Sequence, residues 1–269
     1  MTAAITTSGL RRSFGDVVAL DGLDLEVDRG EVFGLLGHNG AGKTTTVRLL
    51  NGLLLPDDGR ARVLGLDPWS EGSALRARTG VLTEVAAHDK RLDARETLRF
   101  HGRVLGLDQL HERVEAELEH FGISAFAHQR VGGYSKGMAQ RLALARAFLG
   151  EPELLFLDEP IAALDPVAAS QVHAHIRAHA AKGHTVLLCT HNLTEAEKLC
   201  DRVAVLERGR VRTVGTPREL GATGGTLIEV ADGAAALDAL RAAGVQVRRH
   251  EPARRSLDEV YRRLHEDEP

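Results

Sequence analysis

Residues 37–44 form a glycine-rich loop whose pattern, G-x-x-x-x-G-K-[ST], is that of a phosphate-binding loop. Its glycines let the backbone turn so that successive N–H groups point inward as a nest for an anion. Lys43 would reach the β- and γ-phosphates, and the Thr44 hydroxyl would bind Mg²⁺. The expected phosphate-contacting residues are Gly37, His38, Asn39, Gly40, Ala41, Gly42, Lys43, Thr44 and Thr45.

The segments on either side of the loop agree with this interpretation. The apolar run 31–36 is typical of a buried strand, and residues 45–50 are typical of a helix. The positive N-terminal end of that helix would face the phosphates. A glycine-rich turn that happens to precede a lysine is the alternative, and it explains neither flanking element.

Two carboxylates follow a second apolar run, at 153–157. An acid at the end of a core strand is costly to bury unless a partner compensates its charge. Mg²⁺ held by Thr44 and Asp158 would be that partner, and Glu159 would then polarise an attacking water. Two solvated acids at a strand exit are the alternative.

Alternating strand and helix patterns predict an α/β fold with a mainly parallel sheet and covering helices. The N-terminal stretch predicts an antiparallel β subdomain, with strands at 17–20 and 23–27 joined by a turn at Asp21-Gly22. Apolar periodicity between 91 and 150 predicts an inserted helical subdomain, about 85–150, with a turn near Gly132-Gly133. Thr194 and Glu197 form a candidate capping box for the helix after His191.

Beyond Gly221 the sequence becomes rich in glycine and alanine and predicts a small C-terminal α+β extension, 221–269. Strands are expected at 226–230 and 245–249, a helix at 234–243, and a last helix capped by Ser256.

Composition narrows the class of protein. A net charge of -4 over 269 residues argues against non-specific nucleic-acid binding as the main activity. No apolar run approaches the roughly 20 residues of a membrane span, and no export signal is visible at the N-terminus. Cys189 and Cys200 lack metal-site spacing and are expected to be reduced. These features predict a cytoplasmic protein.

Further segments resemble motifs of the ATP-binding cassette (ABC) ATPases, and the resemblance covers nearly the whole chain to about Gly221. Residues 134–138, Tyr-Ser-Lys-Gly-Met, followed by Gln140-Arg141, look like the signature motif. The resemblance implies that Ser135 and Gly137 grip the γ-phosphate held by the opposite subunit. Residues 163–166, Ala-Leu-Asp-Pro, resemble the D-loop, which carries dimer contacts.

Two more residues fit the resemblance, and two depart from it. His191 matches the switch histidine that contacts the γ-phosphate, and Phe14 lies where the family places an aromatic ring against adenine. A structural histidine and a core phenylalanine are the plain alternatives. His38 stands where proline or serine is commoner. Glu84 replaces the usual glutamine beside Mg²⁺, where it would either bind the metal more strongly or repel the γ-phosphate and slow hydrolysis.

The resemblance implies a P-loop NTPase core forming an ABC domain over 1–220, with ATP and Mg²⁺ as cofactors. It further implies a head-to-tail homodimer with two composite sites, in which Glu159, His191 and Glu84 are catalytic and Glu84 also contacts the metal. The expected function is the ATPase subunit of a transporter, peripheral on the inner face of the cell membrane, with separate integral membrane permease subunits.

Three features resemble the subfamily that serves drug and natural-product exporters. They are the variant of the signature motif, the pair Thr83-Glu84 and the ending 256–261. One alternative is an importer ATPase. Another is a soluble ABC ATPase acting on nucleic acid or ribosomes, although this chain lacks the second cassette or long insertions usual there. A third is a module that closes on ATP but hardly turns over.

Overall fold

A six-stranded sheet runs through the larger part of the chain, in the order β5-β6-β7-β3-β8-β9. Strands β5, β6, β7, β3 and β8 pair in parallel, and β9 joins β8 antiparallel, which confirms the predicted mainly parallel sheet. The strands are β3 (Val32–Leu36), β5 (Thr79–Leu82), β6 (Leu154–Asp158), β7 (Thr185–Thr190), β8 (Arg202–Glu207) and β9 (Arg210–Gly215).

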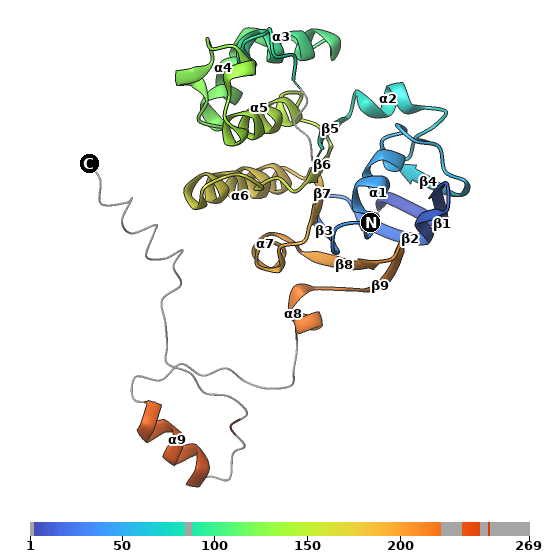
Figure 1. Ribbon diagram of the computed structural model, residues 1–269, viewed down its shortest axis with the longest axis vertical. Helices are drawn as coiled ribbons and strands as arrows, with labels where there is room; N and C mark the ends of the chain where they lie inside the picture. The colour runs from blue at the N-terminus through green and yellow to red at the C-terminus, as the bar shows by residue number, and fades with distance from the viewer. Residues whose placement is uncertain (1–2, 84–87, 222–232, 243–246, 248–269) are drawn as a thin grey trace. The chain divides into compact units, whose positions relative to one another are not determined.

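The computed structural model describes residues 3–83, 88–221, 233–242 and 247 (Figure 1). The chain divides into two units, Met1–Leu220 and Gly221–Pro269. In the smaller unit, the helix predicted at 234–243 is α9 (Gly233–Ala242). The strand predicted at 226–230, all of that at 245–249 except Val247, and the Ser256 cap lie outside the described residues.

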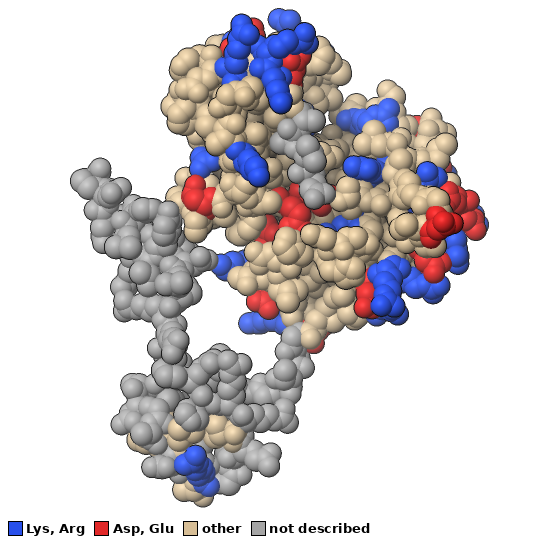
Figure 2. Space-filling model, viewed as in Figure 1, with Lys and Arg blue, Asp and Glu red and all other residues tan. Residues whose placement is uncertain are grey.

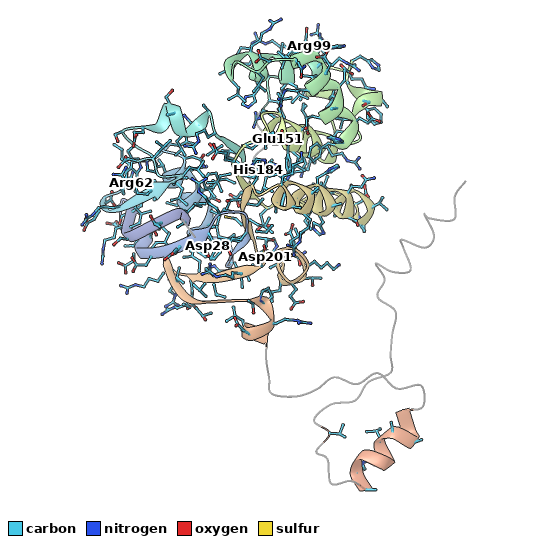
Figure 3. The ribbon with its side chains drawn as sticks, turned by 180° about the vertical axis from the view of Figure 1, so that it is seen from behind. Asp28, Arg62, Arg99, Glu151, His184 and Asp201 are labelled. Carbon is cyan, nitrogen blue, oxygen red and sulfur yellow. The ribbon has the colours of Figure 1, made fainter. Side chains whose placement is uncertain are left out.

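Both faces of the central strands β3, β6 and β7 are buried. Because successive strand residues point to opposite faces, Leu155 and Leu157 of β6 belong to one apolar core, whereas Leu154 and Phe156 belong to another. The first core includes residues of helices α3 to α7, and the second includes α1 and the antiparallel strands (Figures 1 and 3). This double burial explains why β6 and β7 are apolar along nearly their whole length.

The helices vary widely in length, and those of the predicted helical region are α3, α4 and α5. The side chain of Asp93 caps α3 in a reciprocal pair with Glu96. The turn expected near Gly132-Gly133 is a short 3₁₀ helix. The helices are α1 (Lys43–Leu50), α2 (Gly72–Arg76), α3 (Ala94–Val104), α4 (Leu110–His120), η1 (Ser124–Phe126), η2 (Val131–Gly133), α5 (Lys136–Phe148), α6 (Pro166–Ala181), α7 (Leu193–Leu199) and α8 (Pro217–Gly221).

The second sheet is antiparallel and has three strands, in the order β2-β1-β4: β1 (Ala3–Phe14), β2 (Val17–Asp28) and β4 (Asp58–Val63). The turn predicted at Asp21-Gly22 is wrong, because β2 continues through both residues. Leu10 pairs with Leu23 and Arg11 with Asp21, so Gly22 is an extra residue in β2, with φ of +80°. The glycine therefore supplies positive φ for a β-bulge rather than for a turn.

A second local prediction fails at α7. The cap of this helix is Asn192, whose side chain accepts a hydrogen bond from the Glu195 N–H at 3.2 Å, rather than Thr194. Asparagine is as good an N-cap as threonine, and the earlier start places it directly after His191.

Both cysteines are free, as predicted, and both are buried. Burial raises the pKa of the Cys200 thiol to about 12. Burial and then the charge of Asp158 raise the pKa of Cys189. Both therefore stay protonated at neutral pH.

Across the residues that the structure describes, no helix combines the length and the apolar character that crossing a membrane requires.

The double burial of β6 predicts a large stability difference between two phenylalanines. Phe156 is fully buried, so Phe156→Ala should lower the free energy of unfolding by about 3–5 kcal/mol. Phe100 on α3 is 68% exposed, and Phe100→Ala is the matched control, expected to change it by less than about 0.5 kcal/mol. Urea unfolding followed by circular dichroism measures both. Equal losses in the two variants would contradict the central position of Phe156.

Candidate functional site

The phosphate loop connects the end of β3 to the start of α1. Gly40 and Gly42 have φ of +83° and +113°, which side chains with a Cβ rarely adopt. A Cβ on Gly42 would also lie 2.6 Å from the Ala19 carbonyl oxygen, and one on Gly37 would lie 2.5 Å from a carbonyl of β8. The backbone of the loop is therefore fixed both by its own conformation and by its neighbours.

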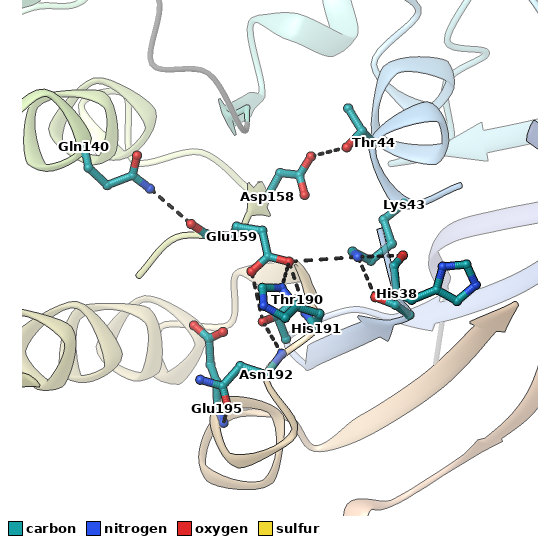
Figure 4. A network of polar contacts seen from close by, with 11 residues as sticks. His38, Lys43, Thr44, Gln140, Asp158, Glu159, Thr190, His191, Asn192 and Glu195 are labelled. Atoms are coloured by element: carbon teal, nitrogen blue, oxygen red, sulfur yellow. Dashed lines mark hydrogen bonds and ion pairs between the residues drawn. The ribbon is translucent and has the colours of Figure 1, made fainter. Parts of the chain in front are cut away.

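Lys43, the first residue of α1, folds back over this loop. Its Nζ donates to the carbonyl oxygens of Gly37, at 2.6 Å, and His38, at 3.3 Å (Figure 4). The residue is only 6% exposed, so its charge lies inside the loop. His38 itself is exposed, with its ring Nδ1 2.7 Å from the Asn39 carbonyl oxygen.

Thr44 and Asp158 meet although they are 114 positions apart in sequence. The Thr44 hydroxyl donates to Oδ2 of Asp158 at 2.7 Å, and Asp158 is 2% exposed (Figure 4). A hydroxyl and a carboxylate are the hard oxygen donors that Mg²⁺ prefers, and this ion commonly takes one or two protein ligands together with water and substrate phosphates. The pair fits a Mg²⁺ site of that kind.

Glu159 occupies a strained backbone position, with φ of +51°. Its carboxylate accepts hydrogen bonds from the Thr190 hydroxyl at 3.4 Å and from the His191 N–H at 3.1 Å. The ring Nδ1 of His191 lies 2.7 Å from Oε1, and Nζ of Lys43 lies 3.9 Å from the same oxygen (Figure 4). The carboxylate is thus directed toward the phosphate loop by the residues that end β7.

Ser135 and Gly137 stand at the beginning of α5. The Ser135 hydroxyl caps this helix by accepting the Met138 N–H at 3.2 Å, and a Cβ on Gly137 would lie 3.0 Å from the Ala163 carbonyl oxygen. The structure thus packs the signature-like segment against the D-loop-like segment. Within the described part of the chain, it does not place Ser135 and Gly137 among the hydrogen-bonded residues around Lys43 and Glu159.

Gln140 is a residue to which the sequence analysis gave no role of its own. Its side-chain amide, on a residue only 7% exposed, donates to the carbonyl oxygens of Glu159 at 3.1 Å and Pro160 at 3.0 Å. It approaches Glu159 from the side opposite Lys43 (Figure 4). The signal that could have found it is a polar residue on the apolar side of α5, beside Ala143 and Leu144.

One predicted residue lies apart from this network, and another falls outside the described residues. Phe14, at the end of β1, is 45% exposed, and the Arg12 guanidinium carbon lies 4.9 Å from the centre of its ring. Glu84 falls in 84–87, outside the described residues, so its role stays a prediction.

Comparisons with known proteins agree with this geometry. A sequence profile described as "ABC transporter" matches residues 20–162. The chain is 47% identical over 230 residues to daunorubicin resistance ATP-binding protein DrrA3 of Streptomyces coeruleorubidus, covering 84% of this chain and 73% of the relative. It is 41% identical over 219 residues to Nod factor export ATP-binding protein I of Rhizobium sp. (strain N33), covering 81% of this chain and 72% of the relative.

The fold has solved counterparts. A structure described as the ATP-binding subunit of an ABC transporter superposes with a TM-score of 0.75 at 29% identity, over 97% of this chain and 99% of that one. The phosphate loop, the paired carboxylates and the sequence matches lead to one conclusion: the chain belongs to the ABC transporter family of ATP-binding proteins.

Proposed function

We propose that this chain is the ATP-hydrolysing subunit of an exporter of drugs or other natural products, acting with separate membrane-spanning permease subunits. The observation that carries the hydrolytic part is the carboxylate of Glu159, held by His191 and Thr190 beside Lys43. The cargo class rests on relatives whose names refer to daunorubicin resistance and Nod factor export. These names favour export over import and over work on nucleic acid or ribosomes.

Binding of ATP would begin at the phosphate loop. The inward N–H groups and the α1 N-terminus suit the charge of the phosphates, and the Lys43 ammonium would exchange its carbonyl partners for phosphate oxygens. Adenine would stack on Phe14. Thr44 and Asp158 would hold Mg²⁺, and Glu84 would approach it; when bound, the ion neutralises charge developing on the β- and γ-phosphates.

Hydrolysis would use Glu159 as the general base toward the attacking water. Its carboxylate accepts hydrogen bonds from the end of β7, so its direction is fixed before the substrate arrives. His191 would donate to the γ-phosphate while its Nδ1 remains beside Glu159. Shared contact with one imidazole would link the position of the base to the presence of the γ-phosphate.

The complete site is proposed to require a second copy of the chain. Ser135 and Gly137 begin a 13-residue helix whose positive N-terminal end suits a phosphate. Gly137 packs beside Ala163, and no described contact joins Ser135 or Gly137 to the phosphate loop of their own chain, so their ligand would be the nucleotide bound by the other subunit. This is the basis for a head-to-tail homodimer.

Helix α3 offers a surface for the permease. Phe100 and Val104 are one helical turn apart on α3 and are 68% and 69% exposed. Figure 2 shows basic side chains gathered over the part of the unit that carries α3, and Arg99 is labelled there in Figure 3. An exposed apolar pair on a helix in a region rich in basic side chains suits a protein partner at the inner face of an anionic membrane.

The homodimer is tested by the solution mass of Glu159→Gln, measured by light scattering with ATP and Mg²⁺, with ADP, and without nucleotide. Loss of the base should block hydrolysis and trap the closed pair, so a dimer is expected only with ATP. A monomer under all three conditions would argue against a self-sufficient homodimer.

The α3 surface is tested by replacing both Phe100 and Val104 with serine. The fraction of the chain that remains on washed membranes containing its permease should fall several-fold, because the apolar contact is lost. Phe126→Ser, at a phenylalanine that is 40% exposed on η1, is the control and should bind normally. Unchanged retention of the double variant would move the docking surface elsewhere.

Gln140 is tested as a positioning residue for Glu159. Gln140→Leu removes both donors to the carbonyl oxygens of Glu159 and Pro160, so kcat should fall about ten- to a hundredfold while KM for ATP changes little. Steady-state phosphate release measures both constants. Gln171→Leu, the same substitution at an exposed position of α6, should leave them unchanged. A normal kcat in Gln140→Leu would separate α5 from catalysis.

A further inference from the structure

The ring of Phe14 already has a charged neighbour on one of its faces. Cζ of Arg12 lies 4.9 Å from the ring centroid. Residues two apart in a strand point to the same side, so β1 itself brings the guanidinium and the ring together. A cation at this distance from a phenyl face is attracted by the negative charge of the π-system.

Asp57 holds the guanidinium in this position. Oδ1 of Asp57 accepts a hydrogen bond from Nη1 of Arg12 at 2.8 Å, and Oδ2 accepts the Ser13 N–H at 2.6 Å. The Asp57 N–H in turn donates to the Arg11 carbonyl oxygen at 2.9 Å. One aspartate therefore contacts the three residues of β1 that immediately precede Phe14.

The arginine is also partly removed from solvent. Its side chain is 26% exposed, and its Nε is a buried atom without a hydrogen-bond partner in the described part of the chain. The guanidinium is therefore held by Asp57 on one side and by the ring on the other. Partial desolvation strengthens the attraction between a cation and a ring.

We propose that Arg12 is a positioning residue for the purine base of the nucleotide. Its guanidinium takes one face of the Phe14 ring, fixes the orientation of the ring, and leaves the opposite face for adenine. This inference rests on the proposed stacking of adenine on Phe14.

The position of Asp57 also links the proposed contact for the base to the phosphate loop. Asp57 lies in the segment that connects α1 to β4, and α1 carries Lys43 and Thr44. The contact for the base and the contacts for the phosphates are thereby joined through one short stretch of chain.

A positive side chain near a triphosphate can also act by attracting the phosphates. The experiment separates this effect from an effect on the stacking of the base. Titration calorimetry with Mg²⁺ gives Kd for ATP and for inorganic tripolyphosphate, which has the phosphates but no base. Arg12→Leu should raise Kd for ATP about two- to fivefold and leave Kd for tripolyphosphate unchanged. Arg11→Leu, with the same change of charge at the neighbouring position, should alter neither constant.

Two further variants complete the test. Asp57→Asn removes the charge that holds Arg12 and should raise Kd for ATP in the same direction. In a Phe14→Leu background, Arg12→Leu should have no additional effect, because the ring through which it acts is gone.

Three results would overturn the inference. An equal loss of tripolyphosphate affinity in Arg12→Leu would show that the arginine acts on the phosphates. Weaker ATP binding in Phe14→Leu but not in Arg12→Leu would leave the stacking intact and remove the role of Arg12. Unchanged ATP affinity in Phe14→Leu would remove the stacking itself, and with it the inference.

Discussion

The strand order β6-β7-β3 is the constraint on which the site depends. In a parallel sheet, the carboxyl ends of adjacent strands open at one edge, where ligands bind. The ends of these three strands supply Asp158 and Glu159, then Thr190 and His191, then the loop that leads to Lys43. Because β7 lies between β6 and β3, Thr190 and His191 stand between Glu159 and the phosphate loop, and the two buried cores that fix the sheet also fix this arrangement.

Helix α5 of the helical region is hydrogen-bonded directly to the residues that follow β6. Gln140 of α5 bonds to the backbone of Glu159 and Pro160, whereas the side chain of Glu159 faces His191. A displacement of α5 would therefore reach Glu159 through its main chain. The D-loop-like segment, close to Gly137, would move with it.

The parts of the fold and site that depend on residues close together in the sequence could be predicted from it. The phosphate loop and the carboxylates after β6 are local patterns with a chemical requirement at each position. Two features that depend on a distant partner could not be predicted, whereas the pairing of Thr44 with Asp158 could, because a shared Mg²⁺ requires it. Asp21-Gly22 has the composition of a turn and becomes a bulge because β1 continues opposite it. The role of Gln140 requires knowing that α5 faces the end of β6.

The positive φ of Glu159 sets the stability of the backbone against the proposed role of the side chain at one residue. A left-handed backbone costs a glutamate of the order of 1 kcal/mol or more, and glycine would escape most of that cost. Glycine would also remove the carboxylate. A search for variants that are only more thermostable would therefore favour loss of the proposed base here, and only a selection that demands turnover would retain it.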